Sequence, residues 1–414
     1  MNLTRTKLLF PLFSSLLLLL SCSQGSYDNG KDSQKPYSIF LGEFSTEEKV
    51  ETFRLSLNTV LQKDLRIEKI YERNFKIYFG RYASSFEAGE AAFELFTNSL
   101  IGKNYKITRD GVAVLDAYAN VLFVSKYLDR ASVFSYNLLT KQTEVEWSNP
   151  LLKVAALNYT PDHTNAFVCA AAGFGQRGKM LYINNAELFL MRREEEETLD
   201  LKSLGDGVQL YTYWENQDTF KVNFSSIDTL VSRIVDQKIY AFDLNGKEGK
   251  TRERKFDLLK NGYPLPPNRT TPNISPNKRF RFREVYSQGE SYIYIRDFDE
   301  KSEQLCATIK GKIFDYRWSE AGNYLFIVTD NKESYGTAGE QHFNELIILN
   351  TDEKRVVRIF AGFNYENLLV HGKLLFYDER SDKSAFIQIY DYRHDKIINT
   401  ITMYGGCGLN NLPQ

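Results

Sequence analysis

The sequence predicts two differently built parts, an α+β domain over residues 37–110 and an all-β repeat array over residues 111–414. The first part contains one short unit twice, as YSIFLGEF at residues 37–44 and as FKIYFGRY at residues 75–82. The second part repeats an apolar strand that ends in Asp or Asn. The 26 Tyr and 29 Phe residues also favour a chain that is rich in β-structure.

Residues 1–21 have the composition of a signal peptide. Arg5 and Lys7 form a basic start, and an apolar run extends from Leu8 to Leu20. A run of this length is too short to cross a bilayer comfortably, which takes about 20 residues, and it suits a cleavable signal. Residues 22–36 are polar and rich in Ser, Asp, Gly and Lys, so we expect a flexible tether there.

The signal ends in the residues LLSC, of which the last is Cys22. This stretch resembles the lipobox of bacterial lipoproteins, in which the Cys is acylated and becomes the mature N-terminus. The resemblance implies lipidation of Cys22 and attachment to a membrane without spanning it. Ser23 stands where Asp would favour inner-membrane retention, so we expect an outer-membrane anchor that faces the periplasm. The alternative is an ordinary secretory signal with an accidental Cys.

Each copy of the doubled unit predicts a strand followed by a helix. Apolar residues alternate with polar ones in both copies, and a Gly follows each alternation. A capping box comes next, formed by Ser45 with Glu48 and by Ser84 with Glu87. Further short strands are expected near residues 66–71 and 105–108. The predicted order is β-α-β-β-α-β, a four-stranded antiparallel sheet with two helices on one face.

Residues 37–110 resemble the SPOR domain, the sporulation-related repeat, because both copies keep the order strand, Gly, aromatic residue and helix cap. Members of this family bind peptidoglycan, specifically glycan strands without stem peptides, on the sheet face that carries no helices. The resemblance therefore implies glycan binding by that face. The chain departs from the family, which often has Gln where Phe40 stands, Ser where Glu43 stands and Arg where Tyr78 stands.

Pleat geometry predicts which side chains lie on the helix-free face. If Ile39 and Ile77 point at the helices, their neighbours along each strand point away. Two aromatic side chains on an open sheet face are expected either to stack on sugar rings or to pack on the next part of the chain. The candidate glycan-binding residues are Ser38, Phe40, Glu43, Lys76 and Tyr78.

A strand-and-turn motif recurs roughly every 40 to 60 residues in the second part, a period typical of β-propeller blades. Another motif, in YTPDHTNAFV and ISPNKRFRF, resembles the strand signature of TolB-type and WD40-like propellers. We predict six blades, or seven if YTYWENQDTFKVNFSSIDTL is a blade of its own; the alternative fold is a pair of β-sandwiches. The motif copies end at Asn137, Asp243, Asp297, Asn350 and Asp391, with a weaker copy at Asn184.

Composition argues against several function classes. The 52 basic and 53 acidic residues nearly cancel, so a nucleic-acid partner has no support. Four dispersed His residues, and Cys169, Cys306 and Cys407, have no metal-ligand spacing. We found no catalytic motif, so we expect no enzymatic activity, no metal and no cofactor.

These observations predict a lipid-anchored cell-envelope protein. Its sheet would bind peptidoglycan glycan strands, and its propeller would be a platform for protein partners or other ligands. One alternative is a non-catalytic assembly protein whose sheet packs on the propeller through Phe40 and Tyr78 and no longer binds glycan. Another is a glycan hydrolase or lyase carried by the propeller.

Overall fold

The computed structural model describes residues 35–57, 61–71, 73–177, 180–227, 234–257, 271–334, 340–380, 384–404 and 408–409. The signal peptide, Cys22, most of the tether and Cys407 lie outside these ranges. Within them the chain folds mainly into antiparallel strands. No helix in these ranges is long and apolar enough to span a bilayer.

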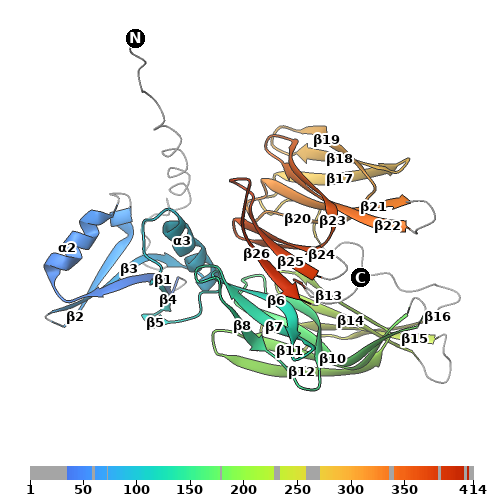
Figure 1. Ribbon diagram of the computed structural model, residues 1–414, viewed down its shortest axis with the longest axis horizontal. Coiled ribbons are helices and arrows are strands. Elements are labelled where there is room, and N and C mark those ends of the chain that lie inside the picture. The colour runs from blue at the N-terminus through green and yellow to red at the C-terminus, as the bar shows by residue number, and fades with distance from the viewer. Residues whose placement is uncertain are drawn as a thin grey trace, which may run out of the picture.

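The first part of the chain forms one antiparallel sheet with two α-helices on one face (Figure 1). Its sheet order is β2-β3-β1-β4-β5, so the expected order β-α-β-β-α-β is present and a short fifth strand extends one edge. The elements are β1 (Tyr37–Phe44), α2 (Glu47–Ser56), the short 3-10 helix η2 (Leu61–Asp64), β2 (Leu65–Tyr71), β3 (Asn74–Tyr82), α3 (Ser85–Thr97), β4 (Lys106–Arg109) and β5 (Val112–Ala113).

Both helix starts are capped, although one cap lies one residue later than expected. The Ser84 hydroxyl accepts the backbone N–H of Glu87, and the Glu87 carboxylate accepts the N–H of Ala83, which confirms a capping box at α3. At α2 the extended residue before the helix is Thr46, and its hydroxyl accepts the N–H of Lys49. The cap expected at Ser45 is therefore wrong by one position.

The described strands of the second part form six consecutive blades. In chain order the strands are β6 (Asn120–Tyr127), β7 (Arg130–Asn137) and β8 (Thr143–Trp147) in blade 1; β9 (Lys153–Tyr159), β10 (Asn165–Arg177), β11 (Met180–Arg192) and β12 (Glu197–Gly207) in blade 2; and β13 (Gln209–Asn216), β14 (Thr219–Ile227), β15 (Ile234–Phe242) and β16 (Arg252–Asp257) in blade 3.

Blades 4, 5 and 6 complete the series. Blade 4 contains β17 (Phe280–Ser287), β18 (Glu290–Asp297) and β19 (Ser302–Lys310). Blade 5 contains β20 (Lys312–Trp318), β21 (Tyr324–Ser334), β22 (Glu340–Asn350) and the first part of β23 (Arg355–His371). Blade 6 contains the second part of β23, β24 (Leu374–Arg380), β25 (Ser384–Asp391) and β26 (Lys396–Tyr404). The long strand β23 pairs first with β22 and then with β24, so it ends blade 5 and begins blade 6.

The repeated Asp and Asn residues end strands and stabilise the turns that follow. In each of five blades this side chain accepts backbone N–H groups from the turn, as Asp297 does from Asp299 and Glu300. The same bonds are made by Asn137, Asp243, Asn350 and Asp391. These five predictions are confirmed.

The weaker copy at Asn184 is a wrong prediction, because this residue lies inside β11 opposite Gly173. The matching turn of blade 2 runs from β11 to β12 and contains Glu196 at φ 52°, the left-handed conformation that Lys301 has in blade 4. The stretch YTYWENQDTFKVNFSSIDTL contributes β13 and β14 of blade 3, so in the described chain it is not a seventh blade.

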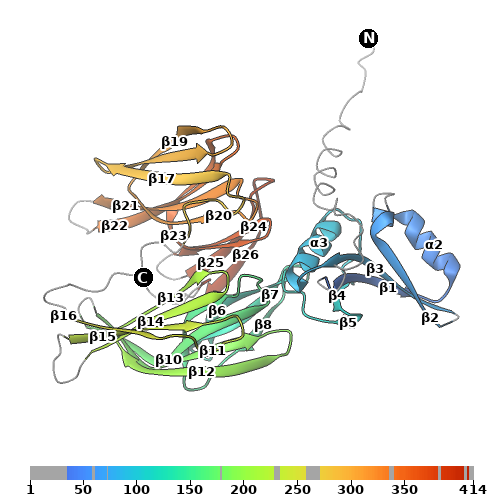
Figure 2. The same ribbon diagram turned by 180° about the vertical axis from the view of Figure 1, so that it is seen from behind.

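Apolar cores join neighbouring blades. Separate clusters join blades 1 and 2, blades 2 and 3, blades 4 and 5, and blades 5 and 6. Blade 6 returns to blade 1, where the Val124 N–H also donates to the Gly408 carbonyl at 2.7 Å. Among the residues that the structure describes, no core cluster joins blades 3 and 4. The ring of blades is therefore open at this seam (Figure 2).

Helix α3 lies between its own sheet and the ring of blades. Ala88, Ala92 and Leu95 pack on the sheet. Phe86 and Phe93 pack instead on blades 1 and 6, in the core that joins those blades. The two parts of the chain are therefore joined by an apolar core to which both contribute, and not only by a linker.

Candidate functional site

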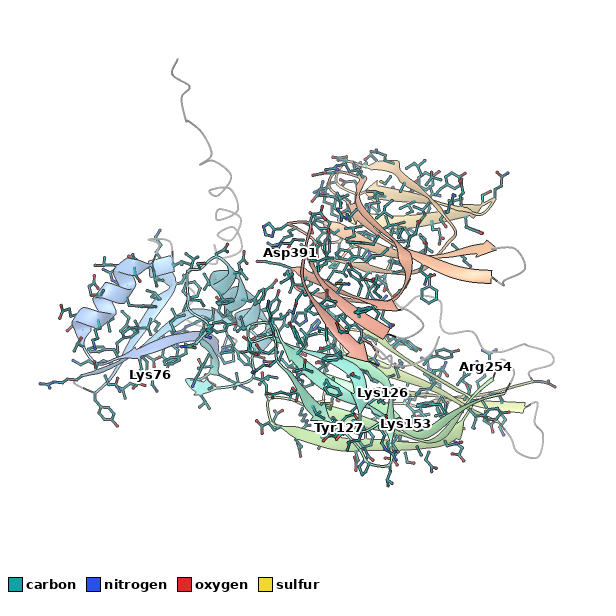
Figure 3. All side chains as sticks on the ribbon, viewed as in Figure 1. Lys76, Lys126, Tyr127, Lys153, Arg254 and Asp391 are labelled. Carbon is teal, nitrogen blue, oxygen red and sulfur yellow. The ribbon has the colours of Figure 1, made fainter. Side chains whose placement is uncertain are left out.

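The helix-free side of the small sheet carries a row of four side chains, one from each of four strands. Arg66 on β2 is opposite Tyr78 on β3, which is opposite Phe40 on β1, which is opposite Lys106 on β4. We call this side the sheet face and define it by Ser38, Phe40, Glu43, Arg66, Glu68, Lys76, Tyr78 and Lys106. Lys76 lies on the side of the sheet away from α2 and α3 (Figure 3).

The centre of the sheet face is a stack of planar groups. The rings of Phe40 and Tyr78 have centroids 5.5 Å apart, and the guanidinium carbon of Arg66 lies 5.0 Å from the centre of the Tyr78 ring. Arg66 also donates a hydrogen bond to the Ser38 hydroxyl at 3.3 Å. Tyr78 is consequently only 2% exposed, and burial, with the nearby Glu68 carboxylate, raises the pKa of its hydroxyl.

Beside this row lies a second row of charges. Lys76 is opposite Glu43 on one neighbouring strand and opposite Glu68 on the other. The Asn74 amide donates to the Glu43 carboxylate and orients it. Both carboxylates are exposed and Lys76 is half-buried. The sheet face therefore offers an aromatic and guanidinium centre flanked by hydrogen-bonding charges of both signs.

The predicted site residues Ser38, Phe40, Glu43, Lys76 and Tyr78 all lie on the sheet face. The expectation that two aromatic rings would be open to solvent is wrong for Tyr78, because Phe40 and Arg66 pack against its ring. Sequence reasoning also missed Arg66. Only the pairing of β2 with β3 shows that its guanidinium lies over a tyrosine of the next strand.

The sheet face is not where the small unit meets the propeller. Phe40 and Tyr78 pack against each other, while α3 contributes Phe86 and Phe93 to the contact with blades 1 and 6. The packing expected for the assembly alternative, through Phe40 and Tyr78, is therefore not the one that the described residues make. A polar contact adds to the docking at the start of the central strand β1, where the Tyr37 hydroxyl donates to the Glu194 carboxylate at 3.2 Å.

A buried aromatic cluster lies at the centre of the docking contact. The Phe86 ring stacks on His163 of blade 2, with centroids 4.5 Å apart, and meets the edge of the His371 ring of blade 6 at 4.9 Å. The ring nitrogen Nε2 of His371 lies 2.8 Å from the Tyr118 carbonyl. Burial lowers the pKa of His163 to about 4 and that of His371 well below its usual value, so both rings are neutral.

Neutral imidazoles could ligate a metal, but no described group of three or more His, Cys, Asp or Glu residues is placed to hold one. The arrangement of His163 and His371 around Phe86 instead fits a structural role. Cys169 is a further buried group, and burial raises the pKa of its thiol.

A cavity of about 410 Å³ lies at the junction of the two parts, beside β4 and the first turn of blade 1. Asp116 lines it and accepts hydrogen bonds from the Tyr105 hydroxyl and the Ala119 N–H, at 3.0 and 2.9 Å. Burial nevertheless raises the pKa of the Asp116 carboxyl to about 6. None of the candidate glycan-binding residues lines this cavity, although the turn residue Asn137 does, and polar groups of the lining such as Asp116 bond mainly to other residues of the junction.

Comparisons with known proteins give no family. No family model matches the chain, and no curated protein matches it. Three solved structures show the degree of structural similarity to known proteins. TolB from Acinetobacter baumannii has 12% identity and a TM-score of 0.42, over 84% of this chain and 80% of that one.

A protein described as a TolB from Agrobacterium tumefaciens has 16% identity and a TM-score of 0.35, over 68% of this chain and 92% of its own. The β-propeller domain of the trilobed protease from Pyrococcus furiosus, described as having an open velcro topology, has 14% identity and a TM-score of 0.26, over 48% and 58%. All three TM-scores are below 0.5, so these structures do not define the fold of this chain. The sheet order and the apolar cores define it.

Proposed function

We propose that this protein is a lipid-anchored envelope protein that binds peptidoglycan glycan strands through the sheet face of a SPOR-like unit. The observation that carries this proposal is the direction of docking. The unit packs on the propeller with α3, on the opposite side of the sheet, so the sheet face remains available to a ligand. The propeller then serves as a platform for a partner, and we propose no catalytic role for it.

The chemistry of the sheet face supports a glycan ligand. The half-buried Phe40 ring offers an apolar surface for the C–H face of a sugar. Arg66 presents a planar guanidinium, and the exposed Glu43 and Glu68 carboxylates can accept hydrogen bonds from sugar hydroxyls. Glycan strands without stem peptides carry free lactyl carboxylates, with which Lys76 and Lys106 can pair.

Arg66 also bears on the departure from the family pattern at Tyr78. The family often has Arg at that position, and here a guanidinium from the neighbouring strand lies over the Tyr78 ring. We propose that Arg66 supplies the cationic contact that Tyr78 lacks. The acylated Cys22 would hold the protein on the outer membrane, and the tether would let the sheet face reach the wall.

The proposal is tested by sedimentation of the full chain with purified sacculi, before and after amidase removes the stem peptides. The double variant Phe40→Ala/Arg66→Ala should lower the bound fraction at least tenfold, since it removes both planar contacts. Tyr78 is left unchanged because it is buried. The matched control is Lys126→Ala in β6, an exposed lysine that is remote from the sheet face (Figure 3).

Wild-type protein should sediment more strongly after amidase treatment, and the control variant should match it. If the double variant binds sacculi as well as wild type does, the sheet face is not the glycan site. If no form binds, the resemblance to SPOR domains concerns the fold alone.

A further inference from the structure

Most blades contain an early strand that is apolar on both faces. Examples are VLFV at residues 121–124, AFVCAA at 166–171, LFIV at 325–328 and LLFY at 374–377. In each, successive side chains enter two different cores, one shared with each neighbouring blade, as Leu325 and Phe326 do. Sheets that are covered on both faces need such continuous apolar runs.

Blades 3 and 4 break this pattern on the sides that would meet each other. In β14 the sequence FKVNFSS alternates: Phe220, Val222 and Phe224 pack on blade 2, while the residues between them are polar, although Lys221, Asn223 and Ser225 are also buried. In β17 the sequence FRFRE alternates likewise, with Phe280 and Phe282 packed on blade 5. Strict alternation is typical of a sheet with one apolar face. The sequence therefore explains why no apolar core among the described residues joins blades 3 and 4.

The side of blade 4 that faces away from blade 5 carries a group of arginines at one end and mixed polar and apolar side chains at the other. We call it the blade-4 face; it consists of Arg281, Arg283, Val285, Glu290, Tyr292, Tyr294, Arg296, Glu303, Leu305, Thr308 and Lys310, which follow from the strand pairing. Arg281 is opposite Arg296, which is opposite Glu303. Four residues further along β17, Val285 is opposite Tyr292.

Positive charge exceeds negative charge at the cationic end. Arg283 forms a salt bridge with Glu303 at 2.8 Å, and its guanidinium carbon lies 4.2 Å from the centre of the Tyr294 ring. The hydrogen bond from Arg283 lowers the pKa of Glu303, and the charges of Arg296 and Arg281 lower it further. Three guanidinium groups of the described blade-4 face thus surround one carboxylate, and Arg281 and Arg296 are exposed.

We propose that the blade-4 face binds an extended acidic polypeptide segment of a partner protein. Guanidinium groups bind carboxylates strongly and in defined geometry, so acidic side chains would pair with Arg281 and Arg296. Leu305, 44% exposed, lies opposite Tyr294 beside the arginines, and Val285, 39% exposed, lies nearer the other end; both provide contacts for apolar side chains of the segment. The inference rests on the platform role proposed for the propeller, but not on glycan binding by the sheet face.

A polypeptide fits this face better than a polyanion such as a nucleic acid or a sulfated glycan. The Glu303 carboxylate lies among the arginines, and Glu290 lies at the other end, hydrogen-bonded to the Tyr292 hydroxyl. The two carboxylates interrupt the positive charge along the face, which suits a segment that mixes acidic and apolar side chains better than a uniformly charged polymer. The exposed aliphatic side chains would also find no partner on such a polymer.

The test measures fluorescence anisotropy of a labelled peptide, Asp-Glu-Asp-Glu-Leu-Val-Leu-Tyr, titrated with the full chain at low and at physiological salt. The charge-reversal variant Arg281→Glu/Arg296→Glu should weaken binding at least tenfold, and the neutral variant Arg281→Gln/Arg296→Gln should weaken it less. The matched control reverses two exposed lysines on other blades, Lys126→Glu/Lys396→Glu, and should stay within twofold of wild type.

Equal binding by the charge-reversal variant and the control would overturn the proposal, as would absence of wild-type binding at millimolar protein. Binding of heparin without binding of the peptide would also reject a polypeptide partner. The sacculus assay separates the two proposals. Arg281→Glu/Arg296→Glu should sediment like wild type, whereas Phe40→Ala/Arg66→Ala should keep its affinity for the peptide.

Discussion

At the scale of single residues, His163 links the local turn chemistry of blade 2 to the docking of the small unit. It has φ 56°, a left-handed conformation, in the turn that its N–H closes on the Thr160 carbonyl at 2.8 Å. This turn places the imidazole against the ring of Phe86 from α3. A residue of a propeller turn motif therefore serves as part of the surface on which another part of the chain packs.

The burial of His163 predicts a loss of stability in mild acid. Its pKa is lowered from 6.5 to about 4, so the unfolded chain binds the proton at higher pH than the folded chain. The stabilisation is complete above pH 6.5 and is lost as the pH falls toward 4, to an extent of about 3 kcal/mol. Chemical denaturation of wild type and His163→Asn between pH 4.5 and 7.5 measures this loss; Asn tolerates the left-handed backbone.

The variant should be less stable than wild type at pH 7, and the difference should shrink as the pH falls. Asp116 and Glu320 act in the opposite direction, because burial raises their pKa values to about 6 and about 7. Their contributions are common to both proteins and cancel in the comparison. A difference that stays constant across this pH range would show that His163 does not titrate as its burial requires.

At the scale of elements, α3 is unusual because it is covered on two sides. Its buried residues include Phe86, Ala88, Gly89, Ala92, Phe93 and Leu95, whereas Val50 is the buried residue of α2. A helix that is apolar around most of its circumference must be buried on more than one side. This signal was present in the sequence SFEAGEAAFELFT and could have predicted the docking of α3.

The close packing around Gly89 predicts that replacing it with Ala lowers stability, which is the opposite of the usual effect in a helix. A Cβ atom there would lie 2.2 Å from Asp116 Oδ1 and 2.8 Å from the Tyr118 Cβ. In an exposed helix Gly→Ala stabilises by about 1 kcal/mol. Here Gly89→Ala should instead destabilise by about 1–3 kcal/mol through overpacking. Thermal unfolding of Gly89→Ala and of the control Gly102→Ala, which has nothing within 4 Å of its new Cβ, measures the effect.

The control should unfold within about 0.5 kcal/mol of wild type, as surface substitutions usually do. A stabilised Gly89→Ala protein would mean that α3 does not contact the propeller in solution as closely as the distances require.

Local patterns of the sequence predicted the elements better than the contacts between them. The cap at Ser84 and the Asx turns at residues such as Asp297 follow from neighbouring residues, so a motif identifies them. The position of Arg66 over Tyr78 depends on strand register, which no local motif fixes. The missing core between blades 3 and 4 corresponds to the alternation in FKVNFSS and FRFRE, which differs from the continuous apolar runs of the other blades.

At the scale of the whole molecule, the small unit is a structural part of the propeller. Phe86 and Phe93 of α3 enter the same core as Phe123 of blade 1 and Phe376 of blade 6. Removal of the small unit would therefore uncover apolar surface on two blades. This differs from an arrangement in which a wall-binding module is carried on a flexible linker beside an independent propeller.

Separate expression of residues 111–414 should therefore give a less stable protein that binds the dye ANS. Each buried Phe is worth about 3–5 kcal/mol against Ala, so the full-length variant Phe86→Ala/Phe93→Ala should show a similar fall in Tm. Calorimetry and ANS fluorescence of the fragment, the variant and wild type make the comparison. Equal melting temperatures for all three would show that the small unit does not stabilise the propeller.

The core shared by α3, blade 1 and blade 6 also bears on the order in which the chain can fold. It brings together residues as far apart in sequence as Phe86 and Leu409, whereas the other blade cores join strands that follow one another. Contacts between distant residues form late, because a long loop must first close. During synthesis, blades 1 to 3 and blades 4 to 6 can each form from chain already made. Blade 6 can pack against blade 1, and α3 can complete its contacts with both blades, only after residues 408–409 have left the ribosome.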